Sequence, residues 1–155
     1  MRSLTDRDQL AAEFRAARND VYAAIQGLNE DQMSRPAADG WSVKDHLSHL
    51  TVWHEFRFYE ISRVARGGGH ALAGMSDADI DKLNEMLVTP RRALSIQQVV
   101  EDLEFARELV LSVIANAPES ALDESRYGEA GLRGGAEHDL EHAQAIRALR
   151  EREGI

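Results

Sequence analysis

The hydrophobic positions of the chain repeat at helical spacing. Apolar residues three or four positions apart define one face of a first long helix: Leu10, Phe14, Ala17, Val21, Ile25 and Leu28. The same spacing recurs in a later segment at Ile96, Val99, Val100, Leu103, Ala106, Val110, Val113 and Ile114. Residues at this spacing fall on one side of an α-helix, so each segment predicts a helix with one buried face. Ser95 and Gln98 have capping-box spacing at the start of the later helix.

Another long helix, between these two, has clear signals at both ends. Ser42 and Asp45 also have the spacing of a capping box, in which each side chain accepts a hydrogen bond from the backbone of the other. Trp41 precedes the cap, where a hydrophobic staple residue is typical. Three glycines at 67–69 oppose continuation of the helix. We therefore predict a helix over about 43–66.

Two further helices complete the pattern. A shorter one follows Ser76 and ends before Pro90, because the residue before a proline disfavours helical geometry. A final helix covers roughly 136–150, after a predicted loop over 118–135. No segment alternates apolar and polar residues at the period of two that is typical of strands.

These elements predict an all-α fold. Four long amphipathic helices favour an antiparallel four-helix bundle, with an additional short helix between the second and third long helices. The chain of 155 residues suits a single domain spanning 1–155. The long connection between the second and third long helices leaves two alternatives, a hairpin or a crossover.

Composition narrows the chemistry. The chain has no cysteine, which excludes disulfides and thiolate metal sites, so a metal would be held by imidazole or carboxylate groups. Acidic residues outnumber basic ones, 27 to 18, for a formal net charge of -9. That charge disfavours binding to nucleic acid or to an anionic membrane surface. With no long apolar run, we expect a cytoplasmic protein without nucleic-acid or membrane partners.

The last predicted helix carries a pair of histidines in the sequence HDLEH. His138 and His142 are four residues apart and therefore share one helical face, where both imidazoles can reach one metal ion. The alternative is that they are hydrogen-bonded core or boundary residues. The pattern is not HExxH, because Glu141 directly precedes His142. Asp139 and Glu141 are either acceptors that orient a ligand imidazole or solvated charges.

A third ligand would come from the helix at 43–66, which carries His46, His49 and His54. On a helical wheel His46 and His54 lie inside the apolar arc, whereas His49 lies at its edge near Trp53. Burial would favour His46 or His54, but an edge position suits a ligand that faces water and substrate. Helical position therefore does not choose among the three. His70, which follows the three glycines, is expected to be a solvated loop residue.

Two segments carry a resemblance to a known family. GWSVKDHLSHLTVW resembles the second-helix signature of the DinB/YfiT-like superfamily, and HDLEHAQAI resembles its last-helix signature. The resemblance implies an antiparallel four-helix bundle with a metal held by three histidines. By position these are His49, His138 and His142, and the implied ion is Zn2+ or Ni2+. His46 and His54 then become controls whose replacement should leave the metal bound.

The resemblance also implies a function class. Several members look like transferases or isomerases that use mycothiol, bacillithiol or glutathione, and others resemble colibactin-resistance hydrolases. We therefore expect a divalent-metal-dependent enzyme that activates a thiol or water against a small electrophilic substrate, with a low-molecular-weight thiol as a cosubstrate. A homodimer is expected from the resemblance alone. The alternative is a non-enzymatic bundle that sequesters a small molecule or serves in a stress response, with a structural metal. The sequence identifies no catalytic residue.

Overall fold

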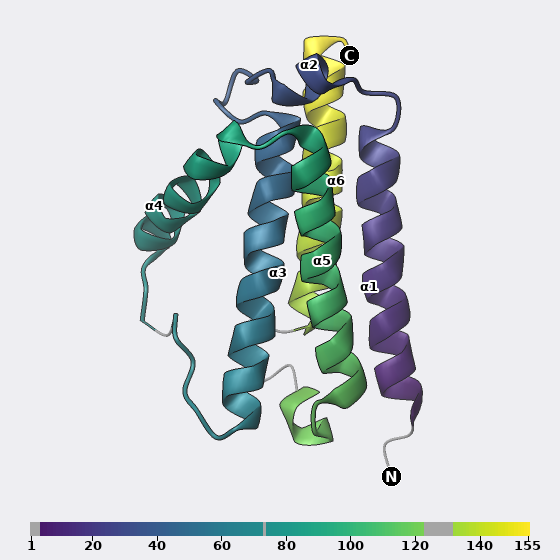
Figure 1. Ribbon diagram of the computed structural model, residues 1–155, viewed down its shortest axis with the longest axis vertical. Coiled ribbons are helices and arrows are strands. Elements are labelled where there is room, and N and C mark those ends of the chain that lie inside the picture. The colour runs from purple at the N-terminus through teal and green to yellow at the C-terminus, as the bar shows by residue number, and fades with distance from the viewer. Residues whose placement is uncertain (1–3, 73, 123–131) are drawn as a thin grey trace.

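The computed structural model is a bundle of helices, described here for residues 4–72, 74–122 and 132–155. Its long helices are α1 (Leu4–Ile25), α3 (Val43–Ala65), α5 (Ile96–Asn116) and α6 (Leu132–Glu153). They stand side by side along the long axis of the molecule (Figure 1). The described residues contain no strand, so the predicted all-α class is confirmed. Within the same residues, no helix combines the length and apolar character needed to span a membrane.

Short elements connect the long helices. They are α2 (Glu30–Ser34), α4 (Asp77–Val88) and the 3-10 turns η1 (Thr89–Ala93) and η2 (Glu119–Leu122). The additional short helix predicted between the second and third long helices is α4. It lies to one side of the bundle, next to α3 (Figure 1).

The long helices do not simply alternate in direction. In Figure 1, α1 and α6 run up the page, whereas α3 and α5 run down. The most extensive contacts join α3 to α5 and α1 to α6, and smaller ones join α3 to α6 and α1 to α5. The segment 66–95, which includes α4, carries the chain back from the end of α3 to the start of α5 (Figure 1). This connection is therefore the crossover, not the hairpin.

Local capping explains why these helices begin where the sequence predicts. Ser42 Oγ accepts from the Asp45 backbone N–H at 3.1 Å, and Asp45 Oδ2 accepts from the Ser42 N–H at 3.1 Å. The same reciprocal capping box starts α2, α4 and α5. At the other end of α3, Gly67 adopts a φ of 84°, a left-handed conformation that glycine accommodates without strain.

The last helix is longer than predicted. It begins at Leu132, not near residue 136, and continues to Glu153. Gly134 and Gly135 lie inside it, although glycine costs a helix interior about 1 kcal/mol relative to alanine. A Cβ atom on Gly135 would lie 2.9 Å from Arg57 Nε, so glycine lets the buried Arg57 side chain lie against α6. In the predicted loop over 118–135, residues 123–131 lie outside the described residues.

The core consists of two apolar clusters with polar residues between them. The first cluster, toward the start of α3, includes Val21, Ala24, Leu47, Leu50, Val99, Leu103, Ala143, Ile146 and Leu149. The second, toward the end of α3, includes Leu10, Phe14, Ile61, Val64, Val110, Val113 and Ile114. His54 on α3 and Arg107 on α5 lie between the two clusters and are fully buried, as is Asp139 on α6. The middle of the bundle is therefore a buried polar layer.

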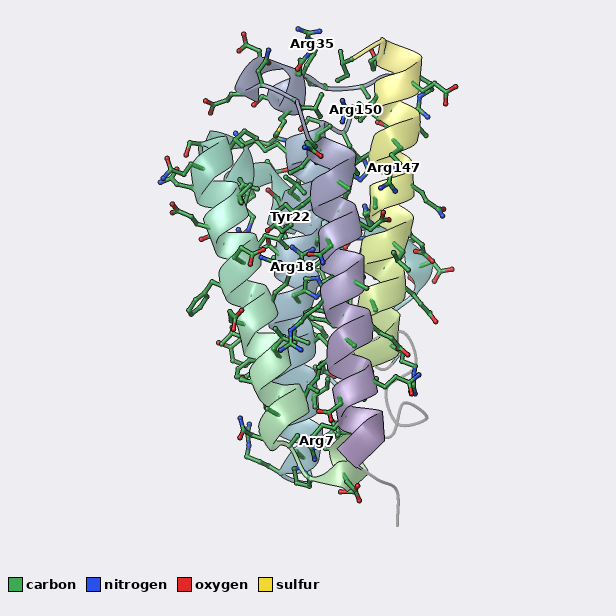
Figure 2. The ribbon with its side chains drawn as sticks, turned by 90° about the vertical axis from the view of Figure 1, so that its right-hand side faces the viewer. Arg7, Arg18, Tyr22, Arg35, Arg147 and Arg150 are labelled. Atoms are coloured by element: carbon green, nitrogen blue, oxygen red, sulfur yellow. The ribbon has the colours of Figure 1, made fainter. Side chains whose placement is uncertain are left out.

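Polar contacts also tie α1 to both of its neighbours. Arg18 and Tyr22 point from α1 toward α5 (Figure 2), where Arg18 Nη2 lies 2.8 Å from Glu104 Oε2 and the Tyr22 hydroxyl donates to Glu104. On the other side, Arg147 of α6 pairs with Asp20 at 2.6 Å. These contacts hold α1 beside the two helices that complete the bundle.

Candidate metal centre

Three imidazoles meet between α3 and α6. His49 Nε2 lies 2.9 Å from His138 Nε2, and His142 Nε2 lies 3.1 Å from the same atom. One ring nitrogen from each of the three residues lies within 4.8 Å of the others. The structure therefore brings together the three residues that the sequence resemblance implies as ligands.

Burial alone does not distinguish His49 from its neighbours. The first turns of α3 are enclosed on all sides, and every residue from Val43 to Thr51 is buried. His49 is buried although it lies at the edge of the apolar arc, and His46 and His54 are buried as helical position predicts. His49 differs in that its Nε2 converges with the two imidazoles of α6.

The arrangement fits a divalent metal ion. Zn–N bonds of about 2.0–2.1 Å at angles between 90° and 110° would place neighbouring ligand nitrogens about 2.8–3.4 Å apart, which includes both observed separations. Burial, followed by the charges of neighbouring histidines, lowers the pKa of His49, His138 and His142 to about 3. The three imidazoles are consequently neutral near pH 7, the form that coordinates metals.

His46 contacts His142, one of the three candidate ligands, so its replacement is no longer an independent control for metal binding. Its Nδ1 lies 2.8 Å from His142 Nδ1, on the opposite side of the ring from the Nε2 that faces His138. Trp41 covers this end of the site: its ring lies 5.3 Å from His46 and 5.2 Å from His49, and stacks on His142 at 6.5 Å between centroids. The sequence indicated Trp41 only as a helix-start residue, because its contact with α6 depends on the tertiary fold.

His54 belongs to the buried polar layer. Its Nε2 lies 2.7 Å from Asp139 Oδ1, and Arg107 Nη2 donates to Asp139 Oδ2 at 3.1 Å. Burial alone would raise the pKa of Asp139, but His54 and Arg107 outweigh it and lower that pKa to about 2. Of the two roles predicted for Asp139, solvated charge or acceptor for a ligand imidazole, the structure shows neither. His54 does not contact the three candidate ligands through a ring nitrogen, so its replacement is still expected to leave a metal bound.

A pocket of about 510 Å³ opens beside the imidazoles, between α3, α4 and α6. His49 and His138 line it, whereas His142 does not. Trp53, Leu72 and Ile80 contribute apolar surface, and Glu141 lies at its edge as an exposed side chain. The site therefore has one side that borders the pocket, formed by His49 and His138, and another side where His142 contacts His46 and Trp41.

His70 is not the solvated residue that the sequence suggested. It is half-buried and lines the same pocket. Its Nδ1 lies 2.9 Å from Oε2 of Glu60, a fully buried carboxylate that also accepts from the Ala71 N–H at 3.1 Å. Glu60 thereby fixes the loop after α3 as one wall of the pocket. The glycines before His70 hid this role, because they indicate a flexible connection.

α4 is attached to the site through both tryptophans of the chain. Trp41 Nε1 donates to Glu85 Oε2 at 3.1 Å, and Trp53 Nε1 donates to Asn84 Oδ1 at 2.8 Å. The ring of Trp53 also contacts His49 and His138, at 6.2 Å and 6.5 Å between centroids. Trp41 and Trp53 therefore contact the imidazoles and also hold α4, which forms one wall of the pocket.

A family model of the DinB superfamily matches residues 13–148. The chain belongs to the DinB superfamily. A crystal structure of an uncharacterised protein from Escherichia coli UTI89 is similar to this DinB-superfamily chain, with a TM-score of 0.79 over 96% of this chain and 95% of the other. At 14% sequence identity, that similarity concerns the fold alone. No curated protein matches the sequence.

Proposed function

We propose that this chain is a metal-dependent enzyme that acts on a small molecule, with His49, His138 and His142 holding a divalent ion, Zn2+ or Ni2+. The observation that carries the proposal is the convergence of three Nε2 atoms, two of them on residues that line a pocket. Three imidazoles from two helices are a ligand set typical of catalytic zinc, which keeps a coordination position for substrate.

The three histidines would have different roles, because only His49 and His138 line the pocket. A bound divalent ion would act as a Lewis acid that lowers the pKa of a thiol or of water and so supplies a nucleophile near neutral pH. His49 and His138 border the pocket, so the nucleophile and an electrophilic substrate would meet on their side. His142, on whose ring Trp41 stacks, would hold the ion without lining the pocket.

The pocket suits a small-molecule substrate. Its volume of about 510 Å³ lies within the range of about 300–1,000 Å³ that is common for ligand sites. Trp53, Leu72 and Ile80 would pack against apolar groups, while Arg57 supplies a fixed positive charge. A low-molecular-weight thiol with an electrophile, or an electrophile hydrolysed by water, are the reactant classes we propose.

Metal analysis of protein purified without a histidine tag tests the ligand set. We expect about one Zn2+ or Ni2+ per chain in the wild type, and a loss of affinity of more than about 100-fold in His138→Ala, because one of three ligands is removed. His70→Ala is the matched control, since it removes a histidine of the same pocket that lies outside the trio. A wild type that binds neither ion, or a His138→Ala variant that binds as tightly as the wild type, would overturn the proposal.

Turnover tests the enzymatic part. A panel of low-molecular-weight thiols with electrophiles, and of hydrolysable electrophiles, should give an activity that a chelator abolishes and added metal restores. A metal-loaded protein that binds members of the panel but turns over none would instead support the sequestering bundle.

A further inference from the structure

The imidazole of His142 has a neighbour on each side. Its Nε2 faces His138 Nε2 at 3.1 Å, and its Nδ1 faces His46 Nδ1 at 2.8 Å. His46 is 7% exposed and lies edge-on to the Trp41 ring. His142 therefore bridges the proposed metal position and a buried histidine of α3.

The number of protons on the two rings determines which imidazole donates the hydrogen bond between His142 and His46. A neutral imidazole carries one N–H and one acceptor nitrogen, and a 2.8 Å separation places one proton between the two Nδ1 atoms. If Nε2 of His142 gives its lone pair to a metal, the proton of that ring must be on Nδ1. His142 then donates to His46, and His46 must present an unprotonated Nδ1.

The nearby carboxylate cannot take this role. Asp139 is adjacent to His138 in sequence, but its two oxygens accept from His54 and Arg107. A second-shell acceptor fixes the tautomer and the ring orientation of a metal-binding histidine. At His142, the Nδ1 atom of His46 lies within hydrogen-bond distance and can serve as that acceptor.

We propose that His46 is the positioning residue of the metal site, which accepts the Nδ1–H of His142 and so holds the Nε2 lone pair of that ring toward the ion. The inference rests on the proposed function, because it presupposes that His142 is a ligand. His46 itself is not a ligand in this assignment, since its Nδ1 faces the nitrogen of His142 that lies away from His138.

Two substitutions separate the hydrogen bond from packing. His46→Phe keeps an aromatic ring against Trp41 but removes the acceptor. His46→Asn loses the ring but keeps an acceptor, because Asn Oδ1 is attached at the same position as His Nδ1. We expect Zn2+ affinity, measured by competition with a chromogenic chelator, to fall about 10- to 100-fold in His46→Phe and to stay close to wild type in His46→Asn. A purely structural role would give the opposite order.

A spectroscopic readout accompanies the affinities. In Zn2+-loaded wild type and His46→Asn, the ¹⁵N signals of His142 should show a protonated Nδ1 and a coordinated Nε2. The circular dichroism of metal-free variants checks the fold, and His46→Leu replaces His46→Phe if the larger ring prevents folding.

The outcomes separate this inference from the proposed function. Wild-type affinity in His46→Phe, or equally weak binding in His46→Phe and His46→Asn, overturns the positioning role while the metal site stands; equal weakening is also the result expected if His46 were itself a ligand. A wild-type protein that binds no metal overturns both the proposed function and the positioning role of His46.

Discussion

Arg107 places a guanidinium group in the centre of the bundle, with 1% of its side-chain surface exposed. Its Nη2 pairs with the fully buried Asp139 at 3.1 Å, and its Nη1 lies 3.4 Å from the Tyr22 hydroxyl. Removing Arg107 would leave the Asp139 carboxylate buried without its cationic partner, although His54 still contacts it. Breaking such a buried pair costs about 3–5 kcal/mol. The stability of the bundle therefore depends on this residue more than on any exposed ion pair.

We predict that Arg107→Leu lowers the free energy of unfolding by about 3–5 kcal/mol, measured by urea denaturation. Arg147→Leu is the control, because it removes an exposed pair with Asp20 and should cost about 1 kcal/mol or less. Similar losses in the two variants would show that the Arg107–Asp139 pair contributes no more than a surface pair.

The residues of the site were predictable to different degrees. His138 and His142 follow from spacing on one helix, because residues four apart share a face. His49 followed only from the family resemblance, since helical position left His46 and His54 as alternatives. The contacts between His46 and His142 and between His54 and Asp139 depend on how α3 and α6 are rotated against each other. A single sequence does not encode that rotation in any local pattern.

At the scale of elements, α3 depends on its first turn. Ser42 is buried, and its hydroxyl and backbone both take part in the capping box with Asp45. We predict that Ser42→Ala lowers the free energy of unfolding by about 1 kcal/mol, whereas Ser42→Gly costs only a few tenths. Urea denaturation of both variants checks this, and an equal loss in the two would argue against the cap as the cause.

Helix boundaries were predictable where local chemistry decides them. α3, α4 and α5 begin at capping boxes that occupy four consecutive residues each. α6 begins before the predicted position and includes Gly135, whose contact with Arg57, far away in sequence, no local pattern indicates. The sequence does not decide between a hairpin and a crossover for the α3–α5 connection, since helix pairing, and not the connecting residues, sets it.

At the scale of the whole molecule, buried neutral histidines make stability depend on pH. Burial is the largest cause that lowers the pKa of the following residues: His46, His49, His54, His138 and His142. In the unfolded chain these groups bind protons below their ordinary pKa of about 6.5, whereas in the folded protein they bind protons only at lower pH. The unfolded state then binds more protons, so folding is weakened as pH falls.

We predict that the metal-free protein keeps its full stability above about pH 7 and loses it progressively as pH falls from about 6.5 toward 3. Each such histidine can contribute up to about 1.4 kcal/mol per pH unit in that window. Urea denaturation in the presence of a chelator at pH 7.5, 6.5 and 5.5 measures the slope, and His49→Asn should reduce it. A free energy of unfolding that is constant from pH 7.5 to 5.5 would contradict the prediction.

α1 packs most extensively against α6, which stands at the other end of the described chain. A ribosome makes α1 first and α6 last of these helices, whereas α3 and α5 are made closer together and pair with each other. During synthesis the apolar face of α1 therefore has no main packing partner until α6 has been made. His49 likewise has no contact with His138 and His142 until α6 has been made. The bundle and the cluster of His49, His138 and His142 are therefore completed together, when the last helix docks.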